Sequence, residues 1–580
     1  MGSFKWDEKH FYINDKPTKI VSGAIHYFRV MPEYWYDRLL KLKECGCNCV
    51  ETYICWNLHE KKEGEFDFSG RLDFVKYLEI AKELGLYAIV RPGPFICSEW
   101  DFGGLPWWLL KYSDIKLRCS NPLFMEKCRP YLERVSALIK PHLITNGGNV
   151  ILVQIENEYG SFGNDKDYLR GLKAIYEEQG IDCGFITSDG DIGFMLQDGT
   201  LPDVLASVNY RTDSEGAAKR LHEFRSGQPS AVMELWNGWQ NHWNKPVVRR
   251  DIEEVAESVR TALIHSELVN MYMFHGGTSF GFMNGGICPV KKFGVHKTSY
   301  DVDAPLDEYG RRTPKYYAEQ RVICEALGIT PENTATDTTF AEYTPHFEGE
   351  CSLRESGISL ATHTSPTPLS MEAYDQAYGC IIYETDFFAG NQGSEVALPE
   401  VHDVAHIYVN GEYVKSIFRD EDEKSFDVET PGWNKIQILV ENLGRVNYGM
   451  NLADKKGLVG DIIVTDKELN HRKYIHGFKV YSLPLDTLPE KYEGKAEKNA
   501  PAFYKFTFTA ENPQDTLIRF EGFFRGFAFI NGFNLGRHWT TEIDDNKLFI
   551  PAPLIRAGEN EIVVFDVLAT DNEKKITLSE

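Results

Sequence analysis

Carboxylates and aromatic side chains gather where short apolar runs end in this sequence of 580 residues. Two carboxyl groups beside planar aromatic rings suit glycoside cleavage, in which one protonates the leaving oxygen and the other attacks or activates water. The aromatic rings would pack against the C–H faces of a sugar. The segments that carry these residues are Glu51–Trp56, Arg91–Trp100, Gln154–Gly160, Met233–Trp236 and Phe274–Thr278.

Some of these carboxylates also have a purely structural interpretation. A buried carboxylate must be paired or hydrogen-bonded, because an isolated charge in a dry interior is very costly. Glu51 could pair with Arg91, and Glu156 could hold a loop, whereas this interpretation is weaker for Glu158 and Glu234. Glu156 and Glu158 share strand parity and point the same way if their strand continues that far.

The fourth of these segments ends in Trp236, and Trp239 and Trp243 follow it. They could contact a sugar, or they could form a hydrophobic lid that touches no ligand. His26 and His275 are as readily supporting groups as catalytic ones. The sequence contains no Ser-His-Asp spacing, zinc-protease motif or phosphate loop that points to a competing chemistry.

The cysteines suggest neither a metal centre nor a disulfide framework. Cys45, Cys47 and Cys49 form one cluster among 12 cysteines, but they lack the second cluster that zinc sites normally use. We therefore expect free thiols, no metal and no cofactor.

Eight strand and helix pairs are expected to position these residues. Between residues 19 and 327, short apolar runs alternate with amphipathic helix patterns, which is typical of βαβ units. This count predicts a (β/α)₈ TIM barrel, whose active site lies at the C-terminal ends of the strands. A doubly wound sheet is disfavoured because no Gly-x-Gly-x-x-Gly follows the first strand. The predicted strands are 20–25, 49–54, 87–90, 150–155, 185–187, 205–208, 231–233 and 271–274.

The chain changes character after a polar, Thr-rich linker at 329–339. Alternating strand patterns follow, and a repeat appears: 405–411 with 432–440 recurs as 527–532 with 558–565. Each copy combines an Asn-Gly hairpin signal with a Gly-x-Asn turn, which predicts two related β-sandwiches. The expected division is a barrel at 1–328, a linker with connecting strands at 329–372, and sandwiches at 373–480 and 481–580.

The net charge excludes several kinds of partner. Lys plus Arg is 62 and Asp plus Glu is 86, so the formal charge of −24 repels nucleic acid and anionic membrane surfaces. No window approaches 18 consecutive apolar residues, and the start lacks an apolar signal core, so we expect a cytoplasmic protein. The sequence leaves a homodimer open.

Taken together, these segments resemble glycoside hydrolase family 35, the β-galactosidases, over nearly the whole chain. The resemblance implies an oligosaccharide substrate with terminal β-galactose, and sandwiches of the jelly-roll, galactose-binding-like type. The resembling stretches are Ser22–Arg29, Glu51–Asn57, Arg91–Leu110, Gln154–Gly160, Tyr272–Thr278, Thr298–Pro305, Gly444–Gly449 and Asn531–Trp539.

The same resemblance implies roles for particular residues. Glu158 corresponds to the acid/base and Glu234 to the nucleophile of a retaining double displacement, which predicts carboxyl groups about 5–5.5 Å apart. Glu158 must then have a raised pKa in the free enzyme. Asn157 is the expected partner of the galactose 2-hydroxyl. The residues expected to bind galactose hydroxyls are Tyr53, Glu99, Asn157 and Tyr300.

Specificity follows less directly from the resemblance. The lysosomal branch carries Tyr where this chain has Trp236 and Phe282, so those contacts do not transfer. With Trp239 and Trp243, Trp236 instead resembles the shorter cytoplasmic bacterial enzymes, which often prefer β-1,3-linked galactose. Tyr448 corresponds to a residue near the leaving group in those relatives. The alternatives are an exo-β-glucosaminidase of the same family and a non-catalytic carbohydrate-binding protein.

Overall fold

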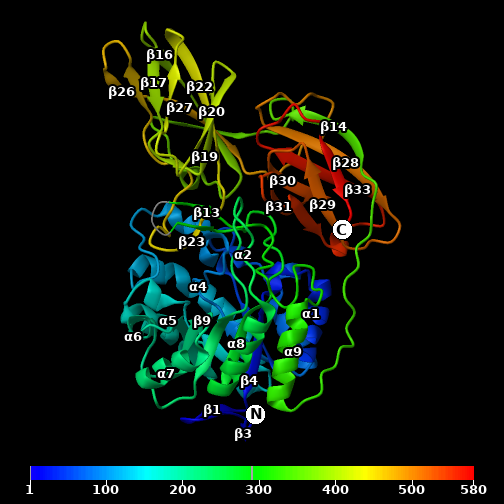
Figure 1. Ribbon diagram of the computed structural model, residues 1–580. Helices are drawn as coiled ribbons and strands as arrows, with labels where there is room; N and C mark the ends of the chain where they lie inside the picture. The colour runs from blue at the N-terminus through cyan, green and yellow to red at the C-terminus, as the bar shows by residue number, and fades with distance from the viewer. Residues whose placement is uncertain (1, 289–291) are drawn as a thin grey trace. The chain divides into compact units, whose positions relative to one another are not determined.

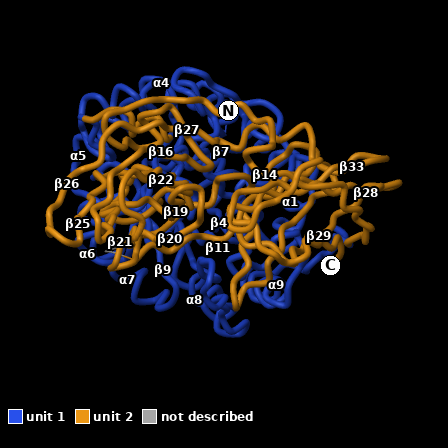
Figure 2. Tube along the Cα trace, turned by 90° about the horizontal axis from the view of Figure 1, so that it is seen from above, with its two compact units in different colours: residues 1–106, 114–279, 299–339 blue, residues 107–113, 280–298, 340–580 orange. Residues whose placement is uncertain are grey.

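The computed structural model describes residues 2–288 and 292–580 (Figure 1). The chain forms two compact units, which Figure 2 colours separately. Unit 1 contains Met1–Pro106, Asp114–Ser279 and Ser299–Thr339, and unit 2 contains Trp107–Ser113, Phe280–Thr298 and Phe340–Glu580.

Unit 1 is built on a closed barrel of eight parallel strands. The strands follow one another around the barrel in chain order, as expected when each is connected to the next by a helix. The predicted (β/α)₈ barrel is therefore confirmed. Its strands are β4 (Ile20–Ile25), β5 (Cys49–Tyr53), β6 (Tyr87–Arg91), β7 (Val150–Gln154), β8 (Gly184–Gly190), β9 (Leu205–Tyr210), β10 (Ala231–Trp236) and β11 (Leu268–His275).

Helices surround the barrel, and each places one apolar stripe against it (Figure 1). Helix α3 begins at Phe74 because the Asp73 side chain caps it by accepting a hydrogen bond from the Lys76 amide. Asp251 caps α8 in the same way. The helices are α1 (Trp35–Glu44), α2 (Trp56–His59), α3 (Phe74–Glu83), α4 (Pro122–Ile139), α5 (Lys166–Glu178), α6 (Gly193–Gly199), α7 (Ser214–Phe224), α8 (Ile252–His265) and α9 (Pro314–Leu327).

A small antiparallel sheet closes the N-terminal end of the barrel. It consists of β1 (Phe4–Trp6), β2 (Phe11–Ile13) and β3 (Lys16–Pro17). Phe11 and Ile13 are buried in one cluster with residues from the beginnings of the barrel strands, such as Ile20 and Cys49. The barrel is thus packed at this end, and its polar strand ends lie at the other.

Unit 2 contains two pairs of facing sheets (Figure 1). In the first pair, a six-stranded and a four-stranded sheet enclose a core that includes Tyr383, Val396 and Ile438. The six-stranded sheet contains β15 (Ala361–Ser365), β27 (Phe478–Leu483), β16 (Cys380–Ala389), β22 (Gly432–Glu441), β19 (Val404–Val409) and β20 (Glu412–Phe418). The four-stranded sheet contains β21 (Ser425–Val428), β17 (Ser394–Ala397), β25 (Ile463–Asp466) and β26 (Arg472–Tyr474).

The second pair is a sandwich of five and three strands around a core that includes Phe506, Ile518 and Val564. The larger sheet contains β14 (His346–Ser352), β28 (Ala502–Ala510), β33 (Gly558–Asp566), β30 (Arg525–Ile530) and β31 (Phe533–Trp539). The smaller contains β32 (Lys547–Ile550), β29 (Thr516–Glu521) and β34 (Lys575–Leu578). Further short strands of unit 2 are β12 (Gly286–Ile287), β13 (Gly294–Val295), β18 (Val401–His402), β23 (Val446–Tyr448) and β24 (Gly457–Leu458).

The sequence repeat corresponds to the same structural device in both sandwiches. Asn410 adopts φ 53° in the β19–β20 hairpin, and its Nδ2 donates to Asn434 Oδ1 at 2.8 Å. Asn531 adopts φ 50° in the β30–β31 hairpin, and its Nδ2 donates to Asn560 Oδ1, also at 2.8 Å. Asparagine tolerates this left-handed conformation and also bonds laterally, which explains why the pattern recurs.

The predicted linker at 329–339 has neither helix nor strand. It is nevertheless fixed, because Glu44 accepts hydrogen bonds from the amides of Thr334 and Ala335 and pairs with Arg312 at 2.7 Å. The predicted domain boundaries stay a prediction. Within the described ranges, no helix combines the length and apolar character that crossing a membrane requires.

Candidate active site

Glu234 lies on β10 at the C-terminal end of the barrel and is 5 % exposed. Its Oε1 accepts hydrogen bonds from Arg91 Nη2 at 2.8 Å and from the Tyr53 hydroxyl at 3.1 Å. Its Oε2 accepts a third from Trp236 Nε1 at 3.0 Å. Three donors, one of them cationic, therefore converge on this carboxyl group.

Glu158 follows β7 and has a different environment. Its Oε1 accepts one hydrogen bond from a neutral donor, Asn209 Nδ2, at 3.1 Å. Burial, and next the negative charge of Glu234, raise the pKa of Glu158 from 4.5 to about 8. The two carboxyl groups therefore interact electrostatically, and this interaction favours the protonated form of Glu158.

The strand that leads to Glu158 ends earlier than its parity pattern suggested. Strand β7 stops at Gln154, and Glu156 and Glu158 both adopt left-handed conformations, with φ 61° and 46°. The condition under which their side chains would point the same way, a strand that continues to Glu158, is therefore not met. Glu156 turns to Arg118 at 2.8 Å, while Glu158 turns to Asn209.

Asn157 lies between these two glutamates, and the structure brings it to Glu234. Its Oδ1 accepts a hydrogen bond from Arg91 Nη2 at 2.6 Å and lies 2.9 Å from the Tyr53 hydroxyl, whose single proton it shares with Glu234. Both donors favour the amide orientation that turns Nδ2 to the opposite side. Asn157 can therefore offer an N–H donor to a ligand while its oxygen stays anchored.

Glu99 and Tyr300 form a second polar group, and the Tyr300 hydroxyl donates to the Glu99 carboxylate. Burial raises the pKa of Glu99, although this hydrogen bond opposes the change. The guanidinium carbon of Arg29 lies 3.8 Å from the centroid of the Tyr300 ring. Arg29 thereby fixes the ring by a cation–π contact and adds positive charge beside the carboxylate.

The three tryptophans differ in exposure. Trp236 is half-buried, Trp239 is 37 % exposed and Trp243 is buried at 7 %. The rings of Trp236 and Trp239 meet edge to face with centroids 5.4 Å apart. Trp236 is tied to Glu234, and Trp239 adds an accessible aromatic surface beside it.

Glu51 and Arg91 form the pair that the structural interpretation predicts, with Nη1 and Oε1 3.7 Å apart. Burial raises the pKa of Glu51 to about 7, and the charge of Arg91 opposes that change. Arg91 is completely buried and contacts Glu51, Glu234 and Asn157. One guanidinium group therefore interacts with two carboxyl groups and one amide oxygen.

Some site residues were missed by sequence reasoning. Arg91 was considered only as a partner for Glu51, yet it lies at the end of β6 and binds Glu234 directly. Asn209 lies near the end of β9 and would have been found by the same rule of searching strand ends. Arg118 lies outside regular helix and strand, so no periodic signal marks it.

The structure also describes the other residues singled out in the sequence. Tyr448 lies on β23 in unit 2, where it pairs with Ile287 of β12. Cys45, Cys47 and Cys49 are buried free thiols. The described part of the chain contains no group of three or more His, Cys, Asp or Glu side chains placed to hold a metal ion.

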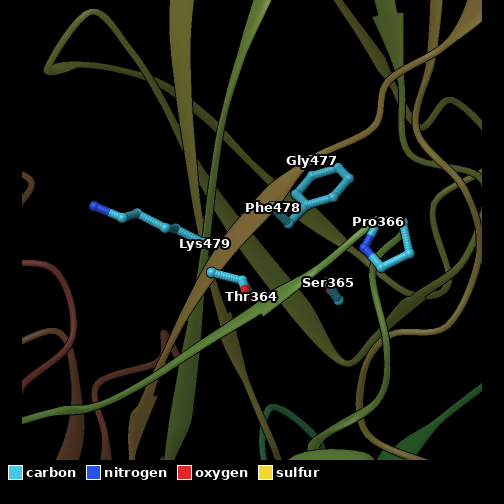
Figure 3. Close-up of a pocket in the computed structure, with 6 residues that line it drawn as sticks. All are labelled: Thr364, Ser365, Pro366, Gly477, Phe478 and Lys479. Atoms are coloured by element: carbon cyan, nitrogen blue, oxygen red, sulfur yellow. The ribbon is translucent and has the colours of Figure 1, made fainter.

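A shallow pocket in unit 2 between β15 and β27 has a cavity volume of about 390 Å³ (Figure 3). The Lys479 side chain extends away from Pro366 and Phe478 in this view. No carboxylate is among its lining residues, so it cannot support chemistry by paired carboxyl groups. The pocket is lined by Thr364, Ser365, Pro366, Gly477, Phe478 and Lys479.

Three family profiles match the chain in succession. Residues 10–326 match "Glycosyl hydrolases family 35", residues 368–483 match "Beta-galactosidase, first all-beta domain", and residues 501–560 match "Beta-galactosidase, galactose-binding domain". The first match spans most of the barrel and every candidate residue in unit 1.

Relatives from bacteria and mammals are similar over most of the chain. A "Beta-galactosidase" of Xanthomonas manihotis is 40% identical over 544 residues, which cover 91% of this chain and 88% of the relative. "Beta-galactosidase-1-like protein 2" of Homo sapiens is 36% identical, over 96% of this chain and 88% of the relative. A "Beta-galactosidase" of Bos taurus is 35% identical, over 96% and 89%.

Proposed function

The chain belongs to the glycosyl hydrolases of family 35 and is a β-galactosidase of that family, and we propose that it removes terminal β-D-galactose by a retaining double displacement. Its substrate is a carbohydrate. The proposal itself concerns four further points: the roles of individual residues, the retention of configuration, exo action and the preferred linkage.

The contrast between the two carboxyl environments carries the assignment of roles. Glu234 accepts three hydrogen bonds, including one from Arg91, which suits a carboxylate nucleophile. Glu158 has one neutral donor and a pKa raised to about 8, which suits a general acid. Contrasting environments of two carboxyl groups are the usual basis of acid and nucleophile assignments.

In the first half-reaction, the Glu234 carboxylate attacks the anomeric carbon while Glu158 protonates the glycosidic oxygen. The glycosidic bond breaks, the leaving alcohol departs with the proton, and galactose stays bonded to Glu234. The partial positive charge of the oxocarbenium-like transition state develops beside both carboxyl groups, and Glu158 becomes anionic as its proton leaves.

In the second half-reaction, Glu158 acts as a base and water replaces the alcohol. Esterification removes the negative charge of Glu234, which is the second cause of the raised pKa of Glu158. The pKa of Glu158 should therefore fall in the intermediate, so that its carboxylate can take a proton from water. Attack of that water on the anomeric carbon releases β-galactose and restores both groups.

We assign recognition of galactose to the polar groups near these carboxylates. The orientation of the Asn157 amide supports donation from Nδ2 to the 2-hydroxyl, a contact that should strengthen in the transition state. Glu99, held by Tyr300, can accept from sugar hydroxyls. The assigned binding residues are Tyr53, Glu99, Asn157 and Tyr300.

A preference for β-1,3-linked galactose is the finest part of the proposal. It rests on the resemblance of Trp236, Trp239 and Trp243 to the shorter bacterial enzymes, and the rings of Trp236 and Trp239 offer a partly exposed aromatic surface in unit 1. The role of Tyr448, which lies in unit 2, stays a prediction from the sequence. Release of galactose from β-1,3- and β-1,4-linked disaccharides under identical conditions tests this preference, and equal rates would contradict it.

Azide trapping tests the two carboxylate roles separately. The Glu234→Gly variant should be inactive, and azide should restore turnover and yield α-galactosyl azide, because a small anion replaces the nucleophile. The Glu158→Ala variant should instead yield β-galactosyl azide from a substrate with a good leaving group. The opposite stereochemistry in either product would reverse the roles.

Two further measurements complete the test. The first anomer released by the wild-type protein, followed by proton NMR, should be β-galactose, and release of α-galactose would exclude retention. Light scattering in solution tests the homodimer, which stays a prediction.

A further inference from the structure

Arg118 and Glu156 form a buried ion pair behind the turn that carries Glu158. Arg118 Nε lies 2.9 Å from Glu156 Oε1, and Nη2 lies 2.8 Å from Oε2, so the pair is bidentate. The residues are 3 % and 1 % exposed. Tyr168 donates a further hydrogen bond to Glu156 Oε1 at 3.0 Å.

The pair holds the backbone of Asn157 from both sides. Glu156 Oε2 accepts a hydrogen bond from the Asn157 amide at 2.6 Å. Arg118 Nη2 donates to the Asn157 carbonyl oxygen at 2.7 Å. The peptide groups before and after Asn157 are therefore fixed by one ion pair, and that residue directly precedes Glu158.

The turn needs such support because its conformation is intrinsically unfavourable. Glu156 and Glu158 adopt φ 61° and 46°, in the left-handed region, which costs about 1–2 kcal/mol per non-glycine residue. This conformation sends three successive side chains in different directions: Glu156 to Arg118, Asn157 to Arg91, and Glu158 to Asn209. An extended backbone would not separate them in this way.

Arg118 is itself held rigidly. Its guanidinium carbon lies 3.7 Å from the centroid of the Phe95 ring and 4.2 Å from that of Phe162. Arg118 also adopts a left-handed conformation, with φ 53°. A lysine could keep the charge, but it would lose both the planar stacking and the bidentate geometry.

We propose that Arg118 and Glu156 are a positioning pair that sets the location of the Glu158 carboxyl group for proton transfer. The inference rests on the proposed role of Glu158 as acid/base. Neither member of the pair is assigned a contact with substrate. The bidentate ion pair fixes the Glu156 side chain. Together, Arg118 and Glu156 then fix the two peptide groups of Asn157. These peptide groups set the direction in which the Glu158 side chain leaves the turn.

The dependence of activity on the leaving group distinguishes positioning of the acid from general damage. A 2,4-dinitrophenyl galactoside needs little protonation, whereas a methyl galactoside needs a well-placed acid. For Arg118→Lys and Glu156→Gln, kcat/KM should fall about 10²-fold on the methyl galactoside. The loss on the dinitrophenyl galactoside, which reports any displacement of Asn157, should be at least about tenfold smaller, because this substrate needs little protonation.

A second buried ion pair of the same unit provides a matched control. Arg312 and Glu44 are paired at 2.7 Å with side chains 4 % exposed, and both side chains also bond to the linker at 329–339. Arg312→Lys should lower thermal stability to a similar extent and leave the ratio of the two activities unchanged. Each variant is judged by the ratio of its activities on the methyl and dinitrophenyl galactosides. If only one of Arg118→Lys and Glu156→Gln folds, that protein alone is sufficient to test the positioning role.

Two results would overturn the proposal. Losses of equal size on both galactosides, or full activity in a folded Arg118→Lys or Glu156→Gln protein, would exclude a positioning role. Glu158→Ala serves as the reference and should show the same leaving-group dependence in a stronger form. If Glu158→Ala does not show it, the acid/base assignment itself is wrong and the inference fails with it.

Discussion

Replacing Glu158 by Gln should stabilise unit 1 at alkaline pH while it abolishes normal acid catalysis. The folded protein raises the pKa of this carboxyl group from 4.5 to about 8. Between these values the unfolded chain has lost the proton and the folded chain retains it. Wild-type stability therefore decreases as the pH rises from about 4.5 to 8, and the glutamine variant lacks this contribution.

The size of the effect follows from the pKa difference. Each pH unit corresponds to about 1.4 kcal/mol, so the stability gained by the variant should grow by about 2 kcal/mol between pH 4.5 and 6. Above pH 8 the gain should level off at about 5 kcal/mol. Because the Glu158 side chain is partly exposed, screening by solvent makes this value an upper limit.

Thermal denaturation from pH 4.5 to 9, followed by calorimetry, measures the difference between the two proteins. Glu83→Gln is the matched control, because it removes the same charge from an exposed position on α3. Its difference from the wild type should change little over this range. If the stability difference between Glu158→Gln and the wild type is as independent of pH as that of Glu83→Gln, or decreases toward alkaline pH, burial and Glu234 do not raise the pKa of Glu158.

Three further outcomes are expected. The value of kcat/KM should fall as the pH passes about 8, because Glu158 loses the proton it must donate, and a profile that stays flat well above pH 8 contradicts this. Tyr53→Phe removes a hydrogen bond to Glu234, so kcat/KM should drop roughly 10- to 100-fold with little change in melting temperature; unchanged kinetics would exclude the role. The Lys456 ammonium group lies 2.8 Å from the buried Asp403 carboxylate. Lys456→Met removes this partner, so the free energy of unfolding of the first sandwich, measured by calorimetry, should decrease by about 3–5 kcal/mol. An unaltered transition would show that Arg419 alone suffices.

Local patterns in the sequence were sufficient to predict the architecture. Alternating strand and helix periods determine a barrel because each apolar run must be buried and each amphipathic helix must cover it. The two Asn-Gly signals predicted related sandwiches, and the Asn410–Asn434 and Asn531–Asn560 bonds explain them. These features depend on neighbours in the chain or on simple burial, so they can be read without coordinates.

The same reasoning reached the candidate carboxylates but not their environments. Chemistry at strand ends pointed to Glu158 and Glu234 because a barrel brings all its C-terminal strand ends together. It could not show that Arg91 serves Glu234 and Asn157 at once, since this contact joins residues 143 and 66 positions apart. Such contacts depend on the exact direction of each side chain after the strands have closed.

The turn after β7 shows most clearly what tertiary structure decided. Strand parity alone would direct Glu156 and Glu158 to the same side, because parity assumes an extended backbone. The ion pair with Arg118, from a loop with no periodic signal, instead stabilises two left-handed residues and separates the two side chains. The sequence by itself therefore determined which residues reach the end of the barrel, whereas long-range pairing decided where each one points.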